Sequence, residues 1–291
     1  MTVPIGLLVM VVAVTVGLVS VTAAIVIGWQ RLARLQTEYR STARAAIPSL
    51  AVLAGVLAIN SVVRDIGVEI SWLIGWNITD QIYALERNLV PVIQSLSHPW
   101  LTIYFSKIYI YGYVFLLVFP LVAYLVLDDM EWFRTTTMAY ALNYAIGLGM
   151  YLIFIAYGPR NMLPDLTEGL LYTNWPTSQF LVSEVNANTN VFPSLHTSLS
   201  VTVIALAYRT RHEYPRWLPI ATLVGGSVVI STMYLAIHWG TDVVAGAVLG
   251  VGCVWLAQRL VDIAIVETLV DTAITALQAL RRGLSRLRNG R

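Results

Sequence analysis

Two histidine-containing stretches decide how this chain is interpreted: Phe192-Pro193-Ser194-Leu195-His196-Thr197-Ser198 and Ser231-Thr232-Met233-Tyr234-Leu235-Ala236-Ile237-His238-Trp239-Gly240-Thr241-Asp242. They contain two of the four histidines of the chain. Between them, two apolar segments are joined by a short basic loop, residues 209–216, so the chain crosses a membrane and returns. We therefore expect both histidines at the same membrane face, in an arrangement typical of an active site.

The composition is that of a polytopic membrane protein. Of the 291 residues, 57% are hydrophobic and 12% are charged, whereas a soluble domain has about 25% charged residues. The mean hydropathy is +0.71. We predict an all-α bundle of membrane-spanning helices. The single cysteine, Cys253, lies in an apolar run and supports neither a disulfide nor a cysteine metal site.

Apolar stretches along the chain predict about seven spans, since about 17–25 residues cross the hydrocarbon layer. The predicted spans are residues 5–29, 45–63, 108–127, 135–159, 192–208, 217–235 and 242–258. The mixed segment 64–106 is expected to form amphipathic helices that lie at the membrane interface. The polar loop 159–191 is expected on the same side as that segment.

This pattern predicts three parts. Residues 1–45 comprise an N-terminal span and a basic cytoplasmic loop, and residues 46–260 form the membrane-embedded catalytic domain. Residues 261–291 form an amphipathic basic cytoplasmic tail, for which a helix on the membrane surface and a solvated terminus are both consistent with the sequence.

The distribution of positive charge predicts the orientation, because cytoplasmic loops carry an excess of Lys and Arg. Residues 31–44, residue 134, residues 209–216 and residues 259–291 hold 14 of the 18 Lys and Arg residues. This places the N-terminus outside and the C-terminus inside a cell membrane. Both histidine stretches are then extracytoplasmic.

The first histidine stretch has the features of a helix N-terminus. We expect Pro193 in the first helical turn, where its missing N–H costs nothing. The free N–H groups of Ser194, Leu195 and His196 would then point outward, as in phosphate sites. A satisfied interface histidine is the alternative interpretation of His196, although ionisable residues within a membrane are more often functional.

In the second stretch, Asp242 follows His238 by four residues. Its carboxylate can accept the imidazole N–H and fix the tautomer, which leaves the other nitrogen free to attack. We expect Thr241 to cap the following helix, with Asp242 in its first turn. The alternative is that the His–Asp pair only caps this helix. Gly246 and Gly250 form a small-xxx-small face on which helices can approach closely.

The two stretches resemble the last two signatures of the type 2 phosphatidic acid phosphatase superfamily, usually written P-S-G-H and S-R-x5-H-x3-D. The resemblance covers roughly the C-terminal half of the chain and implies a six-helix phosphatase-like core. Leu195 replaces the glycine of the first motif, and Thr232 replaces the arginine of the second. The remaining signature, K-x6-R-P, has no clear match, and Arg160 in Tyr157-Gly158-Pro159-Arg160 is a positional candidate. These departures are similar to the inositol phosphorylceramide synthase branch, which transfers a phosphodiester head group between lipids.

The resemblance implies a mechanism without a metal or other cofactor. His238 attacks phosphorus to give a phosphohistidine, Asp242 orients it, and His196 protonates the leaving oxygen. The implied substrate-binding residues are Ser194, Arg160, Thr232 and Tyr157. The expected partners are membrane lipids, with a phospholipid or isoprenoid phosphate as donor and a lipid alcohol or water as acceptor, and no nucleic acid.

Three functions remain open on these residues. The first is a head-group phosphotransferase, the second a lipid phosphate or polyprenyl pyrophosphate phosphatase, and the third a non-enzymatic carrier with the same fold. Thr232 favours the first over the second, because a singly charged phosphodiester needs fewer cations than a phosphomonoester. The presence of His196, His238 and Asp242 disfavours the carrier.

Overall fold

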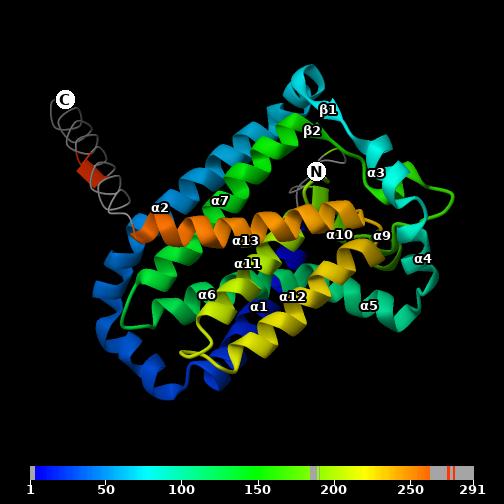
Figure 1. Cartoon of the computed structure of the whole chain (residues 1–291). Helices are drawn as coiled ribbons and strands as arrows, with labels where there is room; N and C mark the ends of the chain where they lie inside the picture. Colours follow the sequence, from blue (N-terminus) through cyan, green and yellow to red (C-terminus); the bar gives the residue numbers. More distant parts are fainter. Residues whose placement is uncertain (1–3, 184–188, 190, 263–273, 276–277, 279–291) are drawn as a thin grey trace, which may run out of the picture.

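Long helices pack side by side in a computed structural model that describes residues 4–183, 189, 191–262, 274, 275 and 278 (Figure 1). The long elements are α1 (Ile5–Val26), α2 (Trp29–Ile74), α5 (Pro99–Lys107) with the π-helical turn η1 (Ile108–Gly112) and α6 (Tyr113–Leu125), α7 (Glu131–Ile153), α11 (Leu195–Arg209), α12 (Trp217–Tyr234) and α13 (Gly240–Asp262). The short ones are β1 (Trp76–Asn77), α3 (Thr79–Glu86), α4 (Leu89–Ser95), β2 (Phe154–Ile155), α8 (Pro159–Met162), α9 (Leu170–Asn174) and α10 (Ser178–Ser183). The predicted all-α membrane bundle is confirmed.

Five of the described helical segments are long and apolar enough to cross a membrane: Ile5–Val26, Tyr39–Val63, Pro99–Leu125, Trp217–Tyr234 and Gly240–Asp262. The other two predicted spans correspond to α7 and α11. Helix α11 packs against α7, α12 and α13. Because these neighbours shield it from lipid, it can carry the buried hydroxyls of Ser198, Ser200 and Thr202.

The chain between residues 29 and 74 differs from the prediction. We expected a basic loop at 31–44, a separate span at 45–63 and interfacial helices from 64, but α2 runs unbroken over 46 residues. At 1.5 Å per residue it is about 70 Å long, more than twice the thickness of the hydrocarbon layer. The break falls earlier, at Gly28, whose φ of 82° is favourable only for glycine.

Two other predicted boundaries were also wrong. The third span begins at Pro99 instead of residue 108, because Lys107 does not interrupt it: the Lys107 ammonium lies 4.2 Å from the centroid of the Trp175 ring. The fourth span ends at Ile153 instead of residue 159, and β2 continues as a parallel partner of β1. The residue before Pro159 is disfavoured in a helix, so the chain stays extended there.

Helices α11 and α13 approach each other closely through two glycines. A Cβ at Gly246 would collide with the carbonyl of Ser194, and a Cβ at Gly250 with the carbonyl of Ser198. The predicted packing role of the small-residue face is therefore confirmed. The contact fixes the N-terminus of α11 beside the first turns of α13.

One end of the bundle joins the predicted cytoplasmic segments. The Arg31 guanidinium pairs with Glu213 at 3.2 Å, and Arg216 donates to the carbonyl of Ile25. The Tyr214 hydroxyl donates to the carbonyl of Ala123 at 2.9 Å. The basic residues at the start of α2 and the 209–216 loop thus share one end. Most of the predicted tail, residues 261–291, lies outside the described residues.

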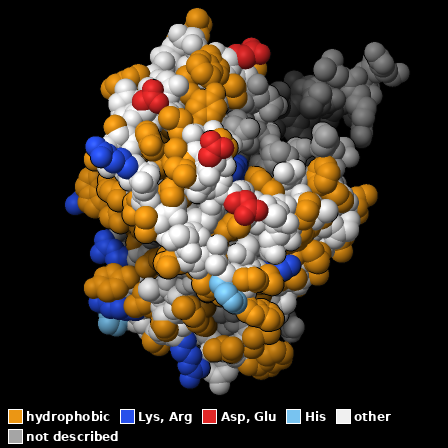
Figure 2. Space-filling view, turned by 90° about the vertical axis from the view of Figure 1, so that its right-hand side faces the viewer, with side chains coloured by type: hydrophobic (Ala, Val, Ile, Leu, Met, Phe, Trp, Pro, Cys, Tyr) orange, Lys and Arg blue, Asp and Glu red, His pale blue; other side chains and the backbone are white. Residues whose placement is uncertain are grey.

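The opposite end carries α3, α4 and the start of α5 (Figure 1). On this face, acidic and basic side chains are spread among uncharged and apolar ones (Figure 2). Gln94 of α4 donates to the carbonyls of Glu168 and Tyr234, which ties the segment between α2 and α5 to the loop after α8 and to the end of α12. The predicted interfacial segment and the 159–191 loop are therefore on the same side, and they cover the end that holds both histidine stretches.

Candidate active site

The loop between α12 and α13 places His238. The N–H groups of Ile237 and His238 both donate to the carbonyl of Thr232, and the N–H of Ala236 donates to that of Met233. This is a Schellman-type helix end, in which Ala236 takes the left-handed position that glycine usually occupies, with φ of 52°. A positive φ is less favourable for alanine than for glycine, but this turn directs His238 back toward α11.

His238 is fully enclosed and close to its predicted partner. Its side chain is 1% exposed, and Nδ1 lies 3.5 Å from Oδ2 of Asp242, which is 0% exposed. Neither imidazole nitrogen makes a hydrogen bond of normal geometry with a described residue. Catalytic hydrogen bonds are often long before substrate binds, so this separation is compatible with the orienting role expected for Asp242.

Asp242 also organises the start of α13. Its Oδ2 accepts the N–H of Trp239 at 2.8 Å, the contact that the third helical residue makes in a capping box. The helix begins at Gly240, so Thr241 is not its cap, contrary to the prediction. Oδ2 of Asp242 therefore caps the helix and also lies next to His238. The capping role and the orienting role of Asp242 are compatible.

His196, in the first turn of α11, lies between two tyrosine rings. The Tyr109 ring stacks on it with centroids 4.4 Å apart and an angle of 20°, and the Tyr113 ring lies at 4.4 Å and 37°. The centroids of the His196 and His238 rings are 6.3 Å apart. The two imidazoles, from α11 and from the loop before α13, are therefore close neighbours.

Arg160 brings a positive charge close to His238. Its guanidinium lies 4.8 Å from the centroid of the Tyr172 ring, and its Nη1 is buried without a hydrogen bond partner among the described residues. Its backbone N–H donates to the carbonyl of Ala236, so α8 docks on the His238 loop. The predicted positional candidate is brought to the site by these contacts.

Ser194 is the N-cap of α11, and its Oγ accepts the N–H of Thr197 at 3.3 Å. Its own N–H donates to the carbonyl of Asp242, so this N–H does not point outward as expected. Pro193 precedes the helix instead of lying in its first turn, and its carbonyl accepts the Tyr151 hydroxyl. Among the described residues, no acceptor receives the Ser194 hydroxyl hydrogen.

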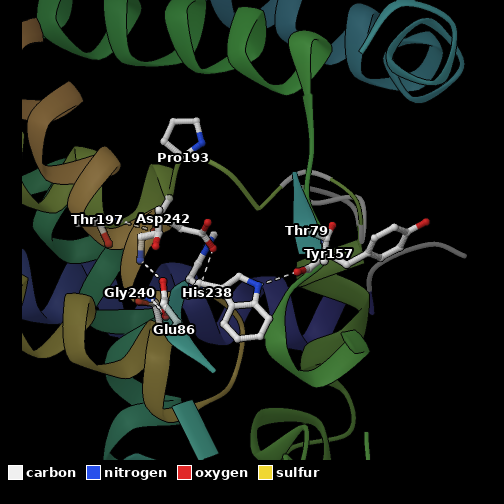
Figure 3. A network of polar contacts seen from close by, with 12 residues as sticks. Thr79, Glu86, Tyr157, Pro193, Thr197, His238, Gly240 and Asp242 are labelled. Atoms are coloured by element: carbon white, nitrogen blue, oxygen red, sulfur yellow. Dashed lines mark hydrogen bonds and ion pairs between the residues drawn. The ribbon is translucent and has the colours of Figure 1, made fainter. Parts of the chain in front are cut away.

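Two predicted substrate-binding side chains face elsewhere. The Thr232 hydroxyl donates to the carbonyl of Val229 at 2.7 Å, and the residue is 0% exposed. Tyr157 points away from His238 and Asp242 (Figure 3). Both residues act through their backbone: the Thr232 carbonyl anchors the His238 loop, and the Tyr157 carbonyl accepts the indole N–H of Trp239 at 2.8 Å.

Three residues of the site were not predicted from the sequence. Tyr109 and Tyr113 flank His196 from the π-helical turn η1 and the start of α6, and a π-turn is frequent at functional sites. Glu86 of α3 accepts the N–H groups of Gly240, at 2.8 Å, and Thr241 (Figure 3). None of these residues belongs to either histidine stretch, and a tyrosine or an acid in an interfacial segment gives no spacing signal.

The electrostatics keep His238 uncharged. Burial lowers the pKa of His238 to about 3; a backbone contact with Val191 opposes this shift, and the positive charge of Arg160 reinforces it. The ring is therefore neutral at physiological pH, the protonation state in which a nitrogen lone pair can attack phosphorus.

Several residues of the candidate site have buried polar atoms without a hydrogen bond partner among the described residues. These atoms include both His238 nitrogens, Oδ1 of Asp242, Nη1 of Arg160, the Tyr109 hydroxyl and the Thr197 hydroxyl. Buried polar groups normally have partners, so donors and acceptors that lack them at one site are compatible with a polar ligand. No group of three or more His, Cys, Asp or Glu side chains in the described part of the chain is arranged to hold a metal ion.

The family comparison agrees with this geometry. The chain matches the model of the PAP2 superfamily over residues 80–256, more than half of its length and from α3 into α13. The chain therefore belongs to the PAP2 superfamily, the type 2 phosphatidic acid phosphatases that the two histidine stretches resemble. This membership supports a lipid phosphatase or phosphotransferase kind of function. Searches of curated proteins and of solved structures gave no match.

Proposed function

We propose that this protein is a lipid phosphotransferase that moves a phosphoryl-linked head group between lipids through a phosphohistidine on His238. The observation that carries the proposal is the neighbouring pair of imidazoles, with ring centroids 6.3 Å apart, of which His238 is 1% exposed. An enclosed nucleophile favours transfer to a bound alcohol over hydrolysis, because bulk water has little access to the phosphorylated ring.

In the first step, a His238 nitrogen attacks the phosphorus of a phosphodiester lipid. The new N–P bond forms as the P–O bond to the diacylglycerol breaks, and His196 gives its proton to the leaving oxygen. In the second step, His196 takes the proton of the acceptor hydroxyl, which attacks phosphorus and releases His238. Asp242 keeps the His238 ring oriented, as the carboxylate of a catalytic triad does.

The charge of the site supports a singly charged substrate. Arg160 is brought to the His238 loop, while the position at which the phosphatases carry their signature arginine holds the buried Thr232. Thr232, together with Leu195 in the first motif, supports a place for this chain in the inositol phosphorylceramide synthase-like branch. We place Arg160 and the Ser194 hydroxyl on the phosphoryl oxygens, and the backbones of Thr232 and Tyr157 in support of the loop.

We further infer that the site is extracytoplasmic in a cell membrane. The contacts between Arg31 and Glu213 and between Arg216 and the end of α1 gather basic residues at the end opposite His238, which supports a cytoplasmic assignment of that end. Since the single cysteine is buried, new cysteines can report this directly. Asp165→Cys should react with an impermeant thiol reagent added to intact cells, and His212→Cys should not; the reverse would place the site inside.

The function is tested with purified protein, a phospholipid donor and a lipid alcohol. We expect the head group to move to the alcohol, with slow hydrolysis when the alcohol is omitted. His238→Ala should abolish the transfer, and His212→Ala, which removes an exposed histidine at the other end, should not. Rapid release of inorganic phosphate from phosphatidate or polyprenyl pyrophosphate, with no transfer, would establish the phosphatase instead.

A further inference from the structure

We propose that α3 positions the nucleophile and that Glu86 is the residue through which it acts, an inference that rests on the proposed use of His238 in catalysis. Helix α3 comes more than 150 residues before His238 in the chain. Its first residue, Thr79, contacts Tyr157, and its last residue, Glu86, contacts the start of α13.

The Glu86 carboxylate contacts the loop directly. Its Oε2 accepts the N–H of Gly240 at 2.8 Å, and its Oε1 accepts the N–H of Thr241. These are the first two N–H groups of α13, which have no partner within a helix. A negative charge is favourable at this positive end of the helix dipole, so Glu86 holds the turn that begins two residues after His238.

The other end of α3 reaches the same loop by a different route. Thr79 Oγ1 accepts the N–H of Tyr157 at 3.1 Å, and the Tyr157 carbonyl accepts the Trp239 indole N–H. The middle of the helix packs against the indole: the Tyr83 and Trp239 rings have centroids 6.3 Å apart. Ile82 belongs to the same buried apolar cluster as Trp239.

The two contacts of α3 hold the three residues that follow the nucleophile: Trp239 through Tyr157, and Gly240 and Thr241 through Glu86. Trp239 is 0% exposed and is held by its indole N–H, by its ring and by its backbone N–H, which donates to Asp242. Loss of the Glu86 contacts would loosen the start of α13. The 3.5 Å distance between His238 Nδ1 and Asp242 Oδ2 would then no longer be fixed. Misplacement of a reacting group by about 1 Å can reduce a rate about 100-fold.

The test compares Glu86→Gln with Asp80→Asn in the full-length protein. Glu86→Gln keeps the shape but puts an NH2 group against a backbone N–H, whereas Asp80→Asn removes an exposed carboxylate from the same helix. We expect Glu86→Gln to lower kcat on the order of 10- to 100-fold with KM changed less than about twofold. Asp80→Asn should match the unmodified protein.

Inhibition by orthovanadate separates positioning from folding. Vanadate mimics the five-coordinate phosphoryl transition state and needs a correctly oriented histidine, so its inhibition constant should rise in Glu86→Gln in parallel with the loss of kcat. Thr79→Val, which removes the other contact of α3, should show the same signature to a smaller extent and covers the case in which Glu86→Gln does not fold.

Each outcome decides one claim. Normal kcat and normal vanadate inhibition in folded Glu86→Gln or, if that protein does not fold, in Thr79→Val would overturn the positioning role, while the proposed function would stand. If His238→Ala retains the activity of the unmodified protein, the proposed function itself fails, and the effect of Glu86 has no nucleophile to act on.

Discussion

The bundle has one buried polar cluster around Asn143 in its middle and another around His238 at its end, and the two differ in how their atoms are paired. Asn143 donates to Ala139 and Thr202 and accepts the Ser198 hydroxyl, and Thr202 in turn donates to the Gly250 carbonyl. Around His238, neither ring nitrogen makes a hydrogen bond of normal geometry with a described residue. Paired groups hold helices together, whereas unpaired ones are available to a ligand.

The comparison predicts its largest effect at His238. His238→Ala should abolish turnover, because no nucleophile remains, and Asp242→Asn should cause a severe loss through the wrong tautomer. Turnover and the thermal unfolding midpoint of each purified variant provide the check. Normal turnover in folded His238→Ala would remove the phosphohistidine mechanism.

His196→Ala should lower kcat by about 10²–10⁴-fold, the usual contribution of a general acid. The loss should shrink for donors whose leaving group is a weaker base, because such a group needs less help from a proton. Rates with a lipid donor and with a nitrophenyl ester are compared in both proteins. An equal loss for the two donors would argue that His196 has a structural role beside Tyr109 and Tyr113.

At Asn143 we expect the opposite pattern. Asn143→Ala leaves the Ser198 hydroxyl without its buried acceptor and should lower the free energy of unfolding by about 1–3 kcal/mol, with kcat per folded molecule unchanged. Thermal unfolding and turnover are measured in parallel, with the exposed Asn174→Ala as control. A loss of kcat without a loss of stability would show that the two clusters are not functionally distinct.

The smallest expected effect concerns pH. Because burial lowers the pKa of His238 to about 3, protonation should not remove the nucleophile as the pH falls from about 7 to about 5.5, a range in which an ordinary histidine of pKa about 6.5 becomes mostly charged. The profile of kcat/KM should therefore show no decline over this range. An acid limb with its midpoint near 6.5 that persists in His196→Ala would mean that His238 is solvated.

The sequence predicted the parts of the site that lie within one stretch of chain. His238 and Asp242 are four residues apart, so their contact follows from local geometry. Gly246 and Gly250 predicted a close helix approach, and the structure shows that the partner is α11. The side chains of Tyr157 and Thr232 face away from His238, which the sequence could not show, because the direction of a side chain depends on the neighbouring loop. Glu86 was missed because its contact spans 154 residues.

The fold shows the same limit. Apolar stretches located the membrane helices, but their ends depended on tertiary contacts. Residues 31–44 continue α2 instead of forming a loop, and Lys107 rests on the Trp175 ring instead of ending a helix. A hydropathy pattern measures the affinity of a segment for lipid. It does not predict which aromatic ring or backbone group a charged side chain will contact.

The most direct test of head-group transfer through His238 is the mass of the covalent intermediate. Protein mixed with a phosphodiester lipid donor is quenched and analysed by mass spectrometry at neutral or alkaline pH, where a phosphoramidate survives. We expect an adduct on His238 whose mass is that of the phosphoryl group with its head group attached, and which disappears when a lipid alcohol is added. A bare phosphoryl group on His238, or an adduct on another residue that persists in His238→Ala, would contradict it.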